Sequence, residues 1–136
     1  MNLDEHAMTD RLLAALENPY IHTIGHPTGR VLLHRDAYAY AFEKIAAKAA
    51  EKGVFMEINA SPERLDLHAS LIRSAKSRGC KFTISTDAHH PKHFLNMRYG
   101  IKMARRGWLE ASDVINTLPL AQFESTIRHS RDKIRA

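Results

Sequence analysis

The sequence predicts an α/β protein in which about three parallel strands are flanked by helices. Three short apolar segments, 21–24, 54–59 and one beginning at Phe82, are typical of strands, and segments with helical periodicity separate them. Strands that alternate with helices at this spacing favour a parallel sheet with right-handed crossovers. A closed eight-stranded barrel typically needs about 250 residues. A chain of 136 residues can therefore form an arc of such a barrel or a small open sheet.

Length and composition indicate one domain, 1–136, with one core, since 44% of the 136 residues are apolar. The net charge of +5 and the pI near 9.6 suit an anionic partner, such as nucleic acid or a phosphorylated substrate. The densest basic clusters are Arg105-Arg106 and the segment 128–135. No aromatic residues alternate with these cations, so an ordinary solvated surface is favoured over a nucleic-acid face.

The single cysteine, Cys80, excludes an intramolecular disulfide and a cysteine-rich zinc site. No apolar segment approaches the ~18 residues of a transmembrane helix. The N-terminus also lacks the basic-then-apolar order of a signal peptide. These features predict a cytoplasmic protein without membrane contact.

The first expected helix follows Thr9 or Asp10, either of which can cap it, and it ends before Pro19. Residues 1–7 are expected to have no element of their own. The apolar residues of this helix recur at helical spacing: Leu12, Leu13 and Leu16.

The strand 21–24 leads into a loop that contains His26, and Asp36 is suited to cap a long helix over 37–52. Gly53 is expected to end that helix in the C′ position. Its buried stripe is predicted to contain Phe42, Ile45, Ala46 and Ala49.

The next strand, 54–59, is almost continuously apolar apart from Glu57 and Asn59. Such a run suits a parallel sheet that is covered on both faces. A helix over about 67–78 follows and is expected to end at Gly79.

Helices alone are expected after the third strand, over about 91–106, 112–118 and 120–134. Gly107 should end the first of them, and Trp108 is expected to fill the hydrophobic seam between the C-terminal helices. The predicted core stripe of the first helix comprises Phe94, Met97, Ile101 and Met103.

Candidate metal ligands stand at two strand ends. Asp87 and His89 lie two residues apart just past the third strand, so both side chains would point the same way from an extended chain. His26 opens the loop after the first strand. The C-terminal ends of parallel strands are where sites gather, and carboxylate and imidazole groups hold divalent metals. In an Asp-x-His pair alone, the aspartate more often caps a turn beside a histidine at the surface. His26 at a second strand end favours the metal-site interpretation.

Other polar residues near these strand ends have two possible roles. Glu57 is either a buried carboxylate paired with Arg30 or Arg64, which is favoured because an unpaired one is costly, or a catalytic acid or base. Asn59 and Arg64 could orient a substrate phosphate or fix the loop. Arg30, in the His26 loop, has the same two possibilities.

Several motifs, in the same order, resemble the C-terminal half of the PHP (polymerase and histidinol phosphatase) domain, most closely that of bacterial family X DNA polymerases. The likeness covers about 9–118, and its motifs are Gly25-His-Pro-Thr-Gly-Arg30, Glu57-Ile-Asn-Ala-Ser-Pro-Glu-Arg-Leu-Asp66, Thr86-Asp-Ala-His89, Met97-Arg-Tyr-Gly100 and Ala104-Arg-Arg-Gly-Trp108. The resemblance implies a portion of a distorted TIM-like β/α barrel whose strand ends hold metal ions, often manganese or zinc. It also implies a phosphoesterase, with 3′-5′ exonuclease or phosphatase activity linked to DNA repair.

Carried over from the family, His26, Asp87 and His89 correspond to metal ligands, and Asp87 and His89 are the candidate catalytic residues. The family's upstream ligands have no counterpart here, and His6 falls in no matching motif. Two histidines and one aspartate can hold one zinc or manganese ion but cannot bridge two. Phosphoester hydrolysis usually needs the second ion, so this chain alone is expected to be weakly active or inactive.

Two classes of function remain. The chain is either an enzyme portion that needs the rest of the barrel, or a non-catalytic remnant that acts as a metal-binding, nucleic-acid-binding or structural module. An open arc with apolar faces would expose strand edges, so the sequence predicts self-association or pairing with a complementing N-terminal half.

Overall fold

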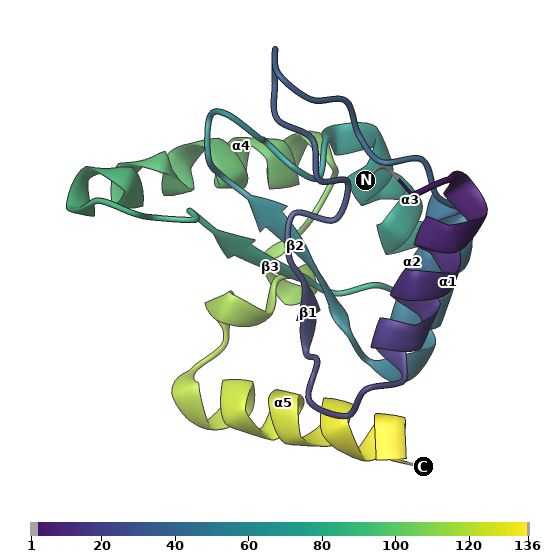
Figure 1. The fold of residues 1–136 in the computed structure, drawn as a ribbon. Helices are drawn as coiled ribbons and strands as arrows, with labels where there is room; N and C mark the ends of the chain where they lie inside the picture. The colour runs from purple at the N-terminus through teal and green to yellow at the C-terminus, as the bar shows by residue number, and fades with distance from the viewer. Residues whose placement is uncertain (1–2, 136) are drawn as a thin grey trace.

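A computed structural model describes residues 3–135, with side chains described for 3–130 and 132. Its centre is a three-stranded sheet of β1 (Thr23–Ile24), β2 (Phe55–Asn59) and β3 (Phe82–Ser85), shown in Figure 1. Both strand pairs are parallel and the spatial order is β1-β2-β3. The predicted α/β class and parallel sheet are confirmed.

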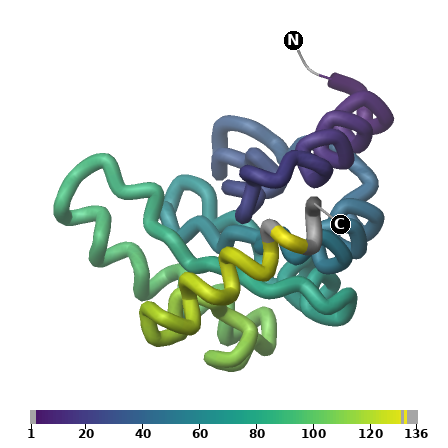
Figure 2. Tube along the Cα trace, turned by 90° about the horizontal axis from the view of Figure 1, so that it is seen from below, coloured from purple at the N-terminus to yellow at the C-terminus, as the bar shows by residue number. Residues whose placement is uncertain are grey.

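Within residues 3–135, five α-helices and three short 3₁₀ turns surround the sheet (Figure 1). The elements are α1 (Glu5–Leu16), α2 (Phe42–Lys52), α3 (Ala69–Ser77), η1 (Pro91–Asn96), α4 (Met97–Arg106), η2 (Ala111–Asp113), η3 (Ile115–Thr117) and α5 (Leu120–Arg135). In both Figure 1 and Figure 2, η1 and the start of α4 project away from the rest of the fold. Figure 2, seen from below, shows α5 crossing the side of the molecule where the strands begin.

The core lies between the sheet and the helices α2 and α3. Met56 and Ile58 of β2 share it with Ile72 of α3 and Phe82 of β3. On α2, the predicted buried residues Ile45, Ala46 and Ala49 are all less than 2% exposed. Side chains alternate along a strand, so the other face of β2 carries Glu57 and Asn59. The expectation of two apolar sheet faces is therefore wrong, because the second face is polar toward the ends of the strands.

The first helix begins earlier than expected. Asp4 is its N-cap, and one carboxylate oxygen accepts a hydrogen bond of 2.8 Å from the backbone N–H of Ala7. Thr9 lies inside the helix, where its hydroxyl donates to the carbonyl of Glu5 and accepts from the N–H of Ala41. The expectation that 1–7 form no element is wrong for residues 5–7, whereas Met1 and Asn2 lie outside the described residues.

The second helix begins later, at Phe42 instead of residue 37. The preceding segment is held in an extended path by the His26 loop, because Tyr38 N–H donates to the carbonyl of Thr28 and the Tyr40 hydroxyl donates to that of Pro27. These tertiary hydrogen bonds override the capping preference of Asp36. The helix ends at Gly53 with a left-handed φ of 71°, as the sequence predicted.

Helix α4 buries different residues from those expected. Phe94 is 68% exposed and Ile101 is 47% exposed, so neither belongs to the core. The buried positions of α4 are Gly100 and Ala104, and Trp108 beyond its end is 71% exposed rather than filling a seam. Small residues face the sheet here because the helix lies too close to it for larger ones. A β-carbon on Gly100 would lie 2.5 Å from a methyl carbon of Ile84.

The outer edge of β3 is closed by a side chain. The Asn116 amide nitrogen donates to the carbonyl of Ile84 at 2.9 Å, and its oxygen accepts from the Ile84 N–H at 3.1 Å. A parallel bridge joins Phe82 to Val114. In the described part of the chain, β1 has a strand neighbour only on its β2 side. The two edges of the sheet therefore differ in what they offer another strand.

Within residues 3–135, no helix has both the length and the apolar character required to cross a bilayer.

Replacing Gly100 with alanine should lower the free energy of unfolding by about 1–3 kcal/mol, because the new methyl group would overlap Ile84 and Ala60. Alanine favours helices over glycine by up to about 1 kcal/mol, so the sign of the change separates packing from propensity. Chemical denaturation measures it. Ile101→Ala, at the exposed neighbouring position, is the control and should change stability by less than about 0.5 kcal/mol. An unchanged or more stable Gly100→Ala variant would contradict the close contact.

Candidate functional site

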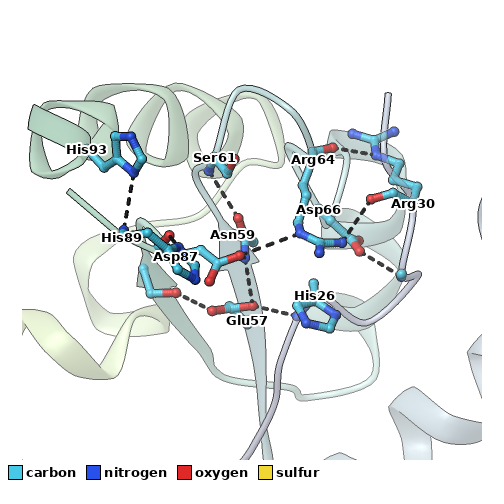
Figure 3. Close-up of polar contacts among 12 residues, drawn as sticks. His26, Arg30, Glu57, Asn59, Ser61, Arg64, Asp66, Asp87, His89 and His93 are labelled. Carbon is cyan, nitrogen blue, oxygen red and sulfur yellow. Dashed lines mark hydrogen bonds and ion pairs between the residues drawn. The ribbon is translucent and has the colours of Figure 1, made fainter. Parts of the chain in front are cut away.

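The C-terminal ends of the three strands lie together, as the sequence predicted (Figure 3). We call this end of the sheet the strand-end edge. His26 follows β1, Asn59 ends β2, and Asp87 and His89 follow β3. His26 and Asp87 both have left-handed backbone angles, with φ of 30° and 52°. Such angles are uncommon outside glycine and are concentrated at binding and catalytic sites, so the two exposed side chains are held in unusual directions.

Glu57 connects the three strand ends. One of its carboxylate oxygens accepts from the Ser85 hydroxyl, and the other accepts from the His26 backbone N–H. The second oxygen also lies 3.4 Å from the Asn59 amide nitrogen. The expected ion pair with Arg30 or Arg64 is wrong, since among the described residues Glu57 pairs with neither arginine. Neutral donors on the neighbouring strands take the place of a cation.

Asn59 separates two carboxylates and is only 1% exposed. Its amide nitrogen lies within 3.3 Å of an Asp87 carboxylate oxygen as well as near Glu57, and its side-chain oxygen accepts from the Ser61 N–H at 3.0 Å. With these contacts the amide is fully used inside the protein. Its observed role is to hold Glu57 and Asp87 in place.

Arg64 is the cation nearest the edge. Its Nε lies 3.5 Å from an Asp87 carboxylate oxygen, and its side chain is 22% exposed. Arg30 turns away from the edge and donates to the backbone carbonyls of Arg64 and Leu65. Arg64 donates in return to the Arg30 carbonyl at 3.3 Å. The two arginines thus connect the loop after β1 with the loop after β2.

Sequence reasoning assigned no role to Asp66, a fully buried residue at the end of a quoted motif. One carboxylate oxygen accepts from the N–H groups of Thr28 and Gly29 at 2.9 and 3.0 Å, which fixes the His26 loop. The other oxygen has no partner among the described residues. Burial raises the pKa of the Asp66 carboxyl, and the Thr28 hydrogen bonds and the charge of Arg30 only partly oppose this effect. The only signal in the sequence was its place at the end of the 57–66 motif, because its partner Thr28 lies 38 residues earlier in the chain.

The imidazole of His89 has one nitrogen available for a ligand. Its Nδ1 lies 2.7 Å from the backbone carbonyl of Asp87, a contact that requires the proton on Nδ1. Nε2 then carries the free lone pair, which is the arrangement that metal-binding histidines use. The backbone N–H of His89 also donates to Nδ1 of His93 at 3.2 Å.

The candidate ligands His26, Asp87 and His89 do not form a metal centre in the described conformation. The described residues contain no group of three or more His, Cys, Asp or Glu side chains that could hold a metal ion. The physical reason is visible in Figure 3, where the Asp87 carboxylate is turned toward Arg64 and Asn59. His26, Asp87 and His89 share this edge of the sheet, but their described positions do not bring three donors together.

A cavity of about 730 Å³ opens on the other side of His26, between its loop and helix α1. Arg11, Arg35 and Tyr38 line it together with His26, whereas Asp87 and His89 do not. This cavity therefore brings His26 together with α1 and the segment 35–39, and does not join it to Asp87 or His89.

Comparison with known proteins shows relatives in two groups. The chain is 33% identical over 129 residues to the DNA polymerase/3′-5′ exonuclease PolX of Bacillus subtilis, covering 95% of this chain and 23% of that protein. It is 26% identical over 132 residues to a probable phosphatase of Thermoanaerobacter, covering 93% of this chain and 51% of that protein. It is 31% identical over 87 residues to a probable phosphatase of Caldanaerobacter subterraneus. No family model matches. The chain thus spans about a quarter of the polymerase and about half of the Thermoanaerobacter relative.

Replacing Asp66 with asparagine should remove one component of the pH dependence of stability. Because the pKa of Asp66 is raised in the folded state, the native protein holds its proton at a pH where the unfolded chain has lost it. The contribution of Asp66 to stability is then fully present below the unfolded pKa, near 3.8, and is lost as the pH rises through the native pKa. Urea denaturation at pH values from 3.5 to 7, in steps of about 0.5, would measure this loss.

The loss should be smaller in Asp66→Asn, which cannot titrate. Asp36→Asn, at an exposed aspartate that is in no ion pair among the described residues, is the control and should keep the wild-type profile. Identical profiles for wild type and Asp66→Asn would show that the buried carboxyl does not titrate differently on folding.

Proposed function

We propose that this chain, whose resemblance to the PHP domain of bacterial family X DNA polymerases is confirmed by its relatives, is one portion of a metal-dependent phosphoesterase site. The observation that supports the proposal is the common strand-end edge, where Glu57 accepts hydrogen bonds from Ser85 of β3, from Asn59 of its own strand and from the His26 loop that follows β1. Relatives named as a 3′-5′ exonuclease and as phosphatases carry out the same class of reaction, which is phosphoester hydrolysis.

His26, Asp87 and His89 would contribute donors for manganese or zinc, with His89 using Nε2. When bound, such an ion supplies Lewis-acid chemistry to phosphoester hydrolysis. The chain does not hold a complete donor set, so the remaining ligands would come from a complementing half of the barrel, in a longer chain or in a partner.

The other edge residues would act on the substrate or on each other. Arg64, which is partly exposed beside Asp87, is suited to bind phosphate oxygens through its planar guanidinium. Arg30 would position Arg64 through the carbonyl contacts between their loops. Asn59 and Glu57 would position Asp87 and the His26 loop, since their polar atoms are used within the protein.

A non-catalytic role is the second candidate. The contact between Arg64 and Asp87 neutralises the carboxylate that a metal would need, and no three-donor group exists among the described residues. A chain in this state could serve as a structural, metal-binding or nucleic-acid-binding module.

Phosphorylated substrates, including DNA, are the partners this proposal implies, and we propose a cytoplasmic location as well. Association is proposed at β1, the strand with a neighbour on one side only. Either a second copy or the complementing half of the barrel would add there.

Metal titration tests the donor set. Mn²⁺ or Zn²⁺ added to the purified chain should bind weakly at one site, and Asp87→Ala or His89→Ala should reduce the affinity by at least about tenfold. The chain carries a matched control, because His6 and Asp10 form an exposed imidazole-carboxylate contact of 3.2 Å on α1. His6→Ala and Asp10→Ala should bind metal as the wild type does. Isothermal titration calorimetry measures all five proteins.

Loss of metal binding in the α1 variants, or full binding by Asp87→Ala, would contradict the proposed site. Hydrolysis is scored separately, with p-nitrophenyl phosphate and with a single-stranded oligonucleotide. Little or no product is expected from the chain alone. Fast Mn²⁺-dependent hydrolysis that survives further purification would show that this chain needs no complementing half.

A further inference from the structure

Trp108 occupies a surface position that the fold does not explain. The indole is 71% exposed, although tryptophan is a large residue that proteins normally bury for most of its area. Its backbone is left-handed, with φ of 63°, a conformation that disfavours bulky side chains. An exposed aromatic residue at a strained backbone position points to a role outside the folding of the chain.

The end of α4 shows that the position favours a smaller residue. The N–H of Leu109 donates to the carbonyl of Ala104, and that of Trp108 donates to the carbonyl of Arg105. This pattern is a helix ending in which the left-handed residue is usually glycine. Here the glycine stands one residue earlier, at Gly107, where a β-carbon would lie 2.3 Å from a methyl carbon of Ile72. Neither packing nor the helix ending requires an indole at 108.

Two cations of α3 contact Trp108, one at the ring and one at the backbone. The guanidinium carbon of Arg73, on α3, lies 4.8 Å from the centre of the Trp108 ring, and its NH1 donates to the Arg106 carbonyl. Lys76 donates to the Trp108 carbonyl at 2.7 Å. Arg105 is exposed at the end of α4, next to Arg106. We call the following residues the Trp108 patch: Trp108, Arg73, Lys76, Lys102, Arg105 and Arg106.

The patch keeps a positive charge after its local ion pairs are counted. Asp113 is occupied by Lys76 at 2.8 Å and by Lys81 at 3.4 Å. Lys102, Arg105 and Arg106 are exposed, and among the described residues none of the three is in an ion pair. These three cations lie within six residues of the exposed ring along the chain.

The patch is separate from the strand-end edge. Lys76 of the patch shares Asp113 with Lys81, which directly precedes β3, so this surface lies beside the start of β3 and not at its end. None of the contacts of Trp108, Arg73 or Lys76 described above involves a candidate site residue.

We propose that the Trp108 patch binds single-stranded nucleic acid. A base would stack on the exposed indole, whose orientation Arg73 fixes, and phosphates would pair with Arg105, Arg106 and Lys102. Flat aromatic platforms set among cations are the common means of binding single strands without sequence preference. An acidic protein surface would need the cations but not the exposed ring, so the ring favours nucleic acid. This binding does not depend on the proposed hydrolysis or on a metal.

Trp108 provides its own probe, because it is the only tryptophan in the chain. Titration with a short oligothymidylate at low salt should quench its fluorescence to saturation, since a stacked base contacts the ring directly. An abasic strand with the same number of phosphates should bind more weakly and quench little. Equal quenching by the abasic strand would overturn the stacking, and equal quenching by oligoglutamate would show that the patch binds acidic peptides instead.

Variants test each part, with anisotropy of a labelled oligonucleotide as the measurement. Trp108→Ala should weaken binding roughly 5- to 100-fold, and Trp108→Phe should retain most of the affinity. The double variant Arg105→Gln with Arg106→Gln should lower the slope of log affinity against log salt by about 1.4, from about 0.7 for each lost phosphate contact.

The matched control removes two exposed arginines elsewhere, Arg11→Gln with Arg128→Gln, and it keeps the patch intact. This control should keep most of the wild-type affinity, whereas the Arg105 and Arg106 double variant should lose it. Circular dichroism should show that every variant is folded. Equal weakening by the two double variants would mean that net charge, and not the patch, carries the binding, and would overturn the proposal.

Discussion

The carboxylate of Glu57 is the interaction on which the strand-end edge depends. It is half-buried without a cation among the described residues, and its oxygens accept instead from the Ser85 hydroxyl of β3, the Asn59 amide of β2 and the His26 N–H of the loop after β1. Because the same amide also reaches Asp87, two negative groups lie at fixed positions with a neutral group between them. The edge is therefore held by hydrogen bonds before any ion is bound, and the left-handed angle of His26 is part of that arrangement.

The edge and the Trp108 patch use cations in different ways. At the edge, Arg64 and Arg30 bind acceptors of the protein, where they neutralise Asp87 and join two loops. Around Trp108, the exposed arginines have no such acceptors among the described residues, and only Arg73 is fixed over the ring. The same residue type thus gives rigidity in one place and a positively charged exposed surface in the other.

Local patterns predicted the parts of the structure that depend on neighbours in the chain. The parallel strands, the end of α2 at Gly53 and the shared edge of His26, Asp87 and His89 all follow from such patterns. Contacts between distant residues were not predictable in this way. The partners of Glu57 come from 31 and 28 residues away, and Arg73 reaches Trp108 from another helix. The exposure of Phe94 and Ile101 was missed because helical periodicity does not show that α4 approaches the sheet through Gly100.

Asn116 has a consequence for how large an assembly could become. Its amide copies the donor and acceptor of a neighbouring strand, so the β3 side of the sheet offers Ile84 no further pairing. A sheet with two available sides can add molecules without limit, as fibrils do, whereas one with a single available side can join once. Two copies that met through β1 would use up both available sides and stop at a closed pair. Association through β1, as proposed above, would then end at a pair, because Asn116 occupies the other side of the sheet at Ile84.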